Sequence, residues 1–310
     1  MISLNSSSSR GKENIKGWVV IAALAAFTTY FCMYGFRKSI SAATFDGITA
    51  FGISLKSALV IAQVLGYMTS KFIGIRFIAE MNKTHRARNI LLLIGGAHLS
   101  LLLMALFPSP VNVFFLFTNG LCLGLIWGLV FSFIEGRKYT DFIALILSIN
   151  FIFSSGAVKS IGRITIESWK VPEIYMPFVT GCIFLPLLFI SVYLLKKIPP
   201  PKAKETLERG ERPVLNNTER RALVKQFLPG LTAVILINLM LTVLRDIKDN
   251  YSVEIIRSIQ PNASPAIFTR METIASLAVI LLLLSLASIR NHFASIQKQH
   301  YVVGIGFLII

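Results

Sequence analysis

The chain has 310 residues, of which 54% are hydrophobic and 15% are charged, and its mean hydropathy is +0.68. Because an average soluble domain carries about 25% charged residues, this composition excludes an ordinary soluble protein and predicts an all-α protein that crosses a membrane several times. The net charge of +16 is compatible with nucleic acid, an anionic membrane surface or an anionic solute as partner.

Eight apolar stretches are long enough to cross a bilayer, which takes about 20 helical residues. In chain order, spanning helices are predicted at 18–39, 55–80, 89–107, 111–134, 141–161, 175–195, 226–246 and 267–289. We expect a cytoplasmic tail at 1–17, a six-helix bundle at 18–195 and a charged cytoplasmic linker at 196–225. The second bundle, 226–310, ends in an apolar run too short to cross a bilayer, so we expect it to be an incomplete half.

Basic residues gather in the tail, in the linker and in the loops after the second and fourth predicted helices, whereas the loop between the third and fourth has none. Cytoplasmic loops of membrane proteins carry an excess of Lys and Arg. This pattern predicts a multi-pass protein of the cell (inner) membrane with a cytoplasmic N-terminus. It also explains much of the positive charge without nucleic acid.

Three predicted helices each carry polar residues at helical spacing, on a single face. The residues are Tyr30, Tyr34, Arg37, Lys38 and Ser41 in the first helix, Gln63, Ser70 and Lys71 in the second, and Asn238, Thr242, Arg245 and Asp249 in the seventh. One polar face on each helix predicts a shared aqueous cavity.

Basic residues within the apolar helices predict what this cavity binds. A lysine such as Lys71 costs roughly 2.5 to 3.5 kcal/mol near the middle of a spanning helix, so it is expected to have a function. Arg37 and Arg245 lie at matching positions, counted from the lysine that opens each helix. In parallel repeats they would face each other at equal depth, and two guanidinium groups suit a phosphate. The predicted substrate is therefore a small anionic solute.

Each of these cations also has a plainer interpretation, which for Lys71 is a purely structural role. Arg37 and Lys38 would reach the membrane interface if they only extended from the end of their helix. Arg245 could pair locally with Asp246 or Asp249. For Lys159, two interpretations remain: its side chain lines the cavity, or it extends to the membrane interface.

Other chemistry is not predicted. The three cysteines lie far apart, without the spacing of a metal site, and no protease, hydrolase or phosphate-loop motif is found, so we expect no metal, no cofactor and no enzyme activity. Acidic residues of the first bundle fall at helix ends or in loops, which favours exchange of anions over proton symport.

Three stretches carry recognisable motifs: YMTSKFIGIRFIAEMNKTHRARN at 67–89, YGFRKSISAA at 34–43 and VLRDIKDNYS at 243–252. They resemble the major facilitator superfamily and, within it, the organophosphate:phosphate antiporters. Ser70, Lys71 and Phe72 match the second-helix signature of that group directly. The resemblance implies two six-helix bundles that rock around a central site, with Arg37 and Arg245 as the phosphate-binding arginines. We expect the protein to be a monomer in membrane lipid.

The resemblance also implies a cytoplasmic latch between the second helix and the end of the fourth. Its expected residues are Glu80, Arg86 and Arg88 on one side and Glu135 and Arg137 on the other. Anchoring of the loop by its positive charge alone is the alternative.

The sequence departs from the antiporter pattern in the fifth helix, where Phe153 takes the position of a histidine and Lys159 is the nearest cation. The substrate therefore stays open, and another family of major-facilitator type fits equally well. Three functions follow: a carrier of a phosphorylated or other anionic metabolite that exchanges it for phosphate, a carrier of a neutral or cationic solute, and a membrane sensor that no longer transports.

Overall fold

The computed structural model describes residues 6–80, 83–136, 140–199, 216–287, 296–302 and 304, and for 6–16, 75–80 and a few isolated positions it describes the backbone only. The helices are α1 (Ser6–Arg37), α2 (Leu55–Glu80), α3 (Arg86–Leu106), α4 (Asn112–Leu123), α5 (Ile126–Ile134), α6 (Thr140–Glu167), α7 (Met176–Lys196), α9 (Asn217–Asn250), α10 (Ser252–Ile259) and α11 (Ala266–Ala287). Short 3-10 helices are η1 (Ser39–Ala42) and η2 (Lys83–His85).

Within these residues, six stretches are long and apolar enough to cross a membrane. They are Gly17–Arg37, Arg86–Leu106, Asn112–Ile134, Phe142–Glu167, Met176–Lys196 and Thr218–Asn250. The prediction of an all-α polytopic membrane protein is confirmed.

The observed helices differ from the predicted ones at several points. α1 already begins at Ser6, inside the predicted tail 1–17, and ends at Arg37. The fourth predicted helix is broken at Gly124 and Leu125 into α4 and α5, and α6 continues past Ile161 to Glu167. α9 begins at Asn217, inside the predicted linker, most of which lies outside the described residues. Asn216 explains the early start, because it forms a capping box with Glu219, with 2.8 Å and 2.9 Å hydrogen bonds.

The first bundle is built around α1, which packs against α6 and α7, while α4 packs against α2 and α3. The contact between α2 and α4 depends on glycines. A Cβ atom on Gly66 would overlap the Phe117 carbonyl of α4, and one on Gly120 would overlap the Gln63 carbonyl of α2. The two backbones therefore touch directly, which is a common way for membrane helices to associate.

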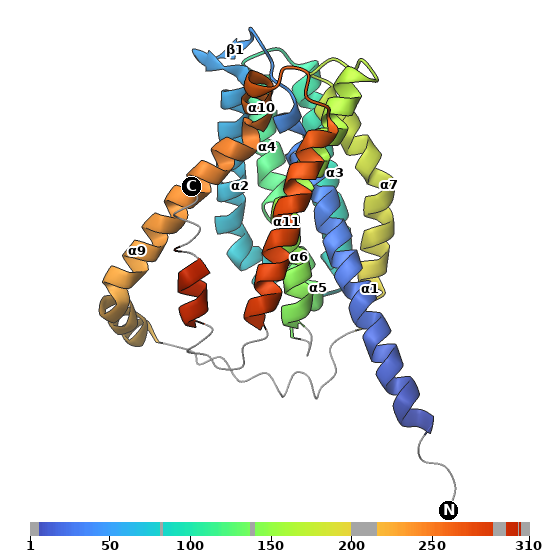
Figure 1. Cartoon of the computed structure of the whole chain (residues 1–310), viewed down its shortest axis with the longest axis vertical. Helices are drawn as coiled ribbons and strands as arrows, with labels where there is room; N and C mark the ends of the chain where they lie inside the picture. The colour runs from blue at the N-terminus through green and yellow to red at the C-terminus, as the bar shows by residue number, and fades with distance from the viewer. Residues whose placement is uncertain are drawn as a thin grey trace, which may run out of the picture.

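The second part of the chain meets the first bundle in two places. α11 lies along α6, where a Cβ on Gly156 would come within 2.5 Å of both the Phe268 carbonyl and the Glu272 side chain. Nearby, the Ser160 and Thr269 hydroxyls are 2.7 Å apart. α9 leans away from the bundle and approaches it only at its C-terminal end, next to α10 (Figure 1).

A small β-hairpin of β1 (Thr49–Ala50) and β2 (Ile53–Ser54) lies at the same end of the molecule as α10 (Figure 1). Phe51 and Gly52 form its turn with φ of 53° and 79°, the two positive angles that a tight two-residue hairpin turn requires. We call this end of the bundle the hairpin end.

Candidate functional site

Four of the predicted site residues line a single cavity of about 100 Å³ between the two parts of the chain, which we call the charged cavity. Its lining residues are Tyr34, Arg37, Lys38, Phe151, Ile152, Ser155, Arg245, Asp246, Lys248, Asp249 and Glu272. They come from α1, α6, α9 and α11, with Lys38 just after α1. The stripes on the first and seventh predicted helices therefore meet, as the helical spacing predicts.

The two arginines reach this cavity from opposite parts of the chain. The Arg37 guanidinium lies over the ring of Tyr67, with 4.1 Å from Cζ to the ring centroid. Arg245 has a 58% exposed side chain and pairs with Asp246 at 3.3 Å. The Arg245 guanidinium is therefore held by a neighbour in sequence, one of the two local partners considered for it.

Asp249 is the centre of a buried ion-pair cluster. Its carboxylate lies 2.6 Å from the Lys38 Nζ and 2.8 Å from the Lys159 Nζ, and it accepts a hydrogen bond from the Ser155 hydroxyl. Both lysines are almost fully buried. Since, among the described residues, one carboxylate pairs with two ammonium groups, the cluster has one excess positive charge.

The whole cavity has an excess of positive charge. Lys248 pairs with the buried Glu272 at 2.7 Å, so this pair is neutral. Its lining holds four basic residues, Arg37, Lys38, Arg245 and Lys248, against three carboxylates, Asp246, Asp249 and Glu272. Counted among the described residues, the lining keeps one excess positive charge, and Lys159, which pairs with Asp249 from outside the lining, adds a second.

Lys71 lies beside a second, larger space of about 480 Å³, which we call the apolar chamber. The described residues that line it are Lys71, Phe72, Gly74, Gly124, Leu125, Trp127 and Gly128. The Lys71 Nζ is 4.9 Å from the centroid of the Tyr67 ring, the same ring that carries Arg37. Tyr67 therefore contacts one cation of each space, Arg37 of the charged cavity and Lys71 of the apolar chamber.

A model of one protein family matches residues 39–310 of this chain, which covers both helical parts. The chain belongs to the DUF5690 family. This family is described as one of unknown function. No curated protein and no solved structure matches the chain. The match includes Lys71, Lys159 and Arg245 and begins just after Arg37 and Lys38.

Two predicted site residues lie elsewhere. Gln63 is buried and donates to the Asn119 side chain at 2.8 Å and to the Arg37 carbonyl at 3.1 Å, so it connects α2 to α4 and α1. Asn238 is exposed on α9, and its amide oxygen accepts from the Thr242 hydroxyl at 3.1 Å. Neither Gln63 nor Asn238 is among the described residues that line the charged cavity.

The predicted latch lies partly outside the described residues, since the side chain of Glu80 and all of Arg137 are not described. Arg86 donates to the Ser132 carbonyl at 2.7 Å, at the end of α5 and close in sequence to Glu135. Arg88 is exposed. The contact of Arg86 with α5 is where the latch was expected, and the latch itself stays a prediction.

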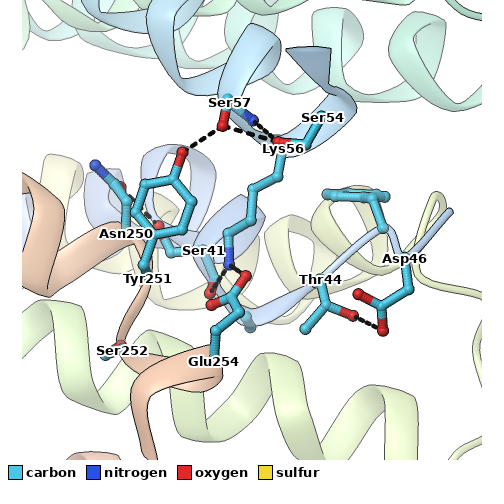
Figure 2. Close-up of polar contacts among 12 residues, drawn as sticks. Ser41, Thr44, Asp46, Ser54, Lys56, Ser57, Asn250, Tyr251, Ser252 and Glu254 are labelled. Atoms are coloured by element: carbon cyan, nitrogen blue, oxygen red, sulfur yellow. Dashed lines mark hydrogen bonds and ion pairs between the residues drawn. The ribbon is translucent and has the colours of Figure 1, made fainter. Parts of the chain in front are cut away.

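Further polar contacts join the two parts of the chain at the hairpin end. Lys56 of α2 is buried and lies 2.5 Å from Glu254 of α10, and the hydroxyls of Ser57 and Tyr251 are 2.6 Å apart (Figure 2). Asn250 accepts from both the Ser41 hydroxyl and the Lys38 ammonium at 2.9 Å. Together with the Asp249 cluster, we call these contacts the hairpin-end clamp.

Sequence reasoning missed the role of Lys56. Its signal was available, because Lys56 opens the second predicted helix at the end that the charge pattern assigns to the outside, where a lysine has no topological explanation. Its partner Glu254 lies in α10, a helix that was not predicted.

Proposed function

We propose that this protein is a secondary carrier of the major facilitator type, which moves a small anionic metabolite, an organic phosphate, across the cell membrane in exchange for phosphate. The observation that supports it is the excess of positive charge in a cavity that two halves of the chain share, with an arginine from each half. In our proposal the N-terminus is cytoplasmic and the hairpin end faces outward.

The charges of the cavity favour an anion over a neutral or cationic solute. Uncompensated charge within a membrane-embedded protein is costly, and an anionic ligand removes that cost. Arg37 and Arg245 bring planar forks that can each donate two parallel hydrogen bonds to phosphate oxygens. To reach a carboxylate, a cation would have to displace Arg245 from Asp246, or Lys38 and Lys159 from Asp249.

The hairpin-end clamp supports alternating access. Its ion pairs join the first bundle to α9 and α10 at one end, whereas α9 leans away from the bundle toward the other end (Figure 1). An anion near Lys38 and Lys159 would compete with Asp249 for their charge. Binding of the anion would thus weaken the clamp and favour opening of the hairpin end, which is the differential binding that coupling requires.

The proposal is tested by exchange of labelled phosphate in proteoliposomes preloaded with phosphate, using the full-length protein. Arg37→Ala and Arg245→Ala should each lower the exchange rate about tenfold or more, because a hydrogen bond to a charged group contributes about 1.5 to 3 kcal/mol. Arg220→Ala, on the exposed first turns of α9, is the matched control and should leave exchange unchanged. Absence of exchange by the unmodified protein would contradict the proposal, as would full activity of both arginine variants.

A further inference from the structure

The apolar chamber indicates which class of anion this carrier takes. We infer that the substrate is an amphiphilic anion, whose charged group is held by Arg37, Arg245 and Lys71 and whose apolar alkyl or aryl group occupies the chamber. This inference rests on the function proposed above and specifies its substrate.

The chamber has the size and chemistry of a site for an apolar group. Its volume of about 480 Å³ lies within the range of roughly 300 to 1,000 Å³ that is usual for small-molecule sites. Three of its described lining residues are glycines and three are large apolar side chains, and Lys71 supplies the one charged group among them. An apolar group would replace water there without leaving polar protein groups unpaired.

The junction of α4 and α5 lies beside this space. Gly124 stands at the junction, and Gly128 follows one helical turn later. A Cβ atom on Gly124 would overlap Ser70 of α2, so this glycine lets the two helices approach closely. Gly128 lines the chamber without a side chain, together with Leu125 and Trp127.

The chamber and the charged cavity lie on two sides of one aromatic cluster. Trp127, which lines the chamber, is 4.9 Å between ring centroids from Phe151, which lines the cavity. Tyr30 packs against both rings at 5.0 Å and 5.8 Å. Because Arg37 and Lys71 share the Tyr67 ring, a molecule with its anionic group beside Arg37 in the charged cavity would have its remainder near Lys71 and Trp127, which line the chamber.

The sizes of the charged cavity and the apolar chamber indicate which part of the substrate each of them would hold. The charged cavity measures about 100 Å³, which is room for only a few waters at about 30 Å³ each, so it suits a compact anionic group. A sugar against the chamber walls would exchange hydrogen bonds to water for contact with apolar side chains, and the described lining offers only the Lys71 ammonium in return. Burying unpaired hydroxyls is unfavourable, so an apolar group fits better than a carbohydrate.

The test is a chain-length series measured by competition with labelled inorganic phosphate for the purified full-length protein in nanodiscs. The probes are methyl, butyl and hexyl phosphate, with glycerol phosphate as the polar comparison and hexyltrimethylammonium as a tail without an anion. Each buried methylene should tighten binding about fourfold, so butyl phosphate should compete at least tenfold better than methyl phosphate. Glycerol phosphate should show no such gain, and the ammonium compound should not compete.

A Gly128→Leu variant should fill the chamber. It should bind inorganic phosphate like the unmodified protein and lose the gain from chain length. Gly95→Leu on α3, where no described atom lies within 4 Å of the added Cβ, is its control and should keep that gain. Leu125→Ala enlarges the chamber and should shift the preference toward longer chains.

The outcomes separate this inference from the proposed function. If inorganic phosphate binds but butyl phosphate is no better than methyl phosphate, or if both chamber variants keep the original chain-length profile, the amphiphile assignment is wrong and the carrier proposal stands. Equal competition by hexyltrimethylammonium would show that the tail binds to lipid or protein without the anion site, and would also overturn the inference. If no phosphate compound binds, both the amphiphile assignment and the carrier proposal are wrong.

Discussion

Lys38, just after α1, and Asp249, near the end of α9, form an ion pair with 2.6 Å between Nζ and Oδ2. Lys159 of α6 approaches the other oxygen of the same carboxylate at 2.8 Å. One acidic residue therefore joins three elements and both parts of the chain. Because both lysines are buried, the carboxylate is their main compensation, and its removal should affect stability and conformation together.

The substitution Asp249→Asn should destabilise the protein strongly. It leaves two buried ammonium groups without their counter-charge, and breaking a buried pair in this way typically costs about 3 to 5 kcal/mol. Thermal unfolding in nanodiscs should show a clearly lower midpoint. Asp46→Asn is the control, since Asp46 is exposed and accepts from the Thr44 hydroxyl, and its midpoint should hardly change. Equal midpoints for the two variants would show that the cluster around Asp249 is not a stabilising contact.

Lys56 and Glu254 should be energetically coupled across the two parts of the chain. Their side chains are 2% and 35% exposed and 2.5 Å apart, so the pair is screened less than a surface pair. A double-mutant cycle with Lys56→Met and Glu254→Gln should give a coupling of about 1 to 2 kcal/mol in unfolding experiments. The exposed pair of Arg245 and Asp246 should give less than about 1 kcal/mol. A coupling at Lys56 no larger than this would argue against a clamp.

The direct backbone contact between α2 and α4 should make Gly120 intolerant of any side chain. Gly120→Ala places a methyl group onto the Gln63 carbonyl, and since backbone cannot rotate away, the helices must separate. We expect a loss of several kcal/mol or no monodisperse protein at all, measured by size-exclusion chromatography and thermal unfolding. Gly95→Ala on α3 meets no described atom within 4 Å, and it should be neutral or stabilising by up to about 1 kcal/mol, because alanine favours a helix. Similar behaviour of the two variants would contradict the contact.

Asn119 should be needed for the packing of the first bundle. Its side chain accepts from Gln63 at 2.8 Å and donates to the carbonyls of Ala97 at 2.9 Å and Phe36 at 3.3 Å. Asn119→Leu should cost about 1 to 3 kcal/mol, because it leaves buried polar groups without partners. The neighbouring Thr118→Val loses only an exposed hydrogen bond within its own helix and should change the unfolding midpoint little. The comparison fails to support this role if the leucine variant unfolds like the valine variant.

The sequence determined the membrane class and most of the spanning helices, since a helix satisfies its own backbone within one apolar stretch and its signal is local. The bounds of α2 are those predicted, and those of α3, α7 and α11 differ by only a few residues. Helical spacing also placed Tyr34, Arg37, Lys38 and Arg245 on faces that meet in one cavity. This part was predictable because the spacing of polar residues along a helix determines which of them share a face.

The tertiary structure decided what each face meets. Asp249 was a possible partner of Arg245, yet it pairs with Lys38 and Lys159, which come close only when α1, α6 and α9 converge. Gln63 shares the stripe of Lys71 but is turned toward Asn119, because α2 and α4 touch at their glycines. The junction at Gly124, a residue that lines the apolar chamber, had no periodic signal of its own. Ion pairs, close contacts and cavities depend on distances between helices, and no local pattern in the sequence specifies those distances.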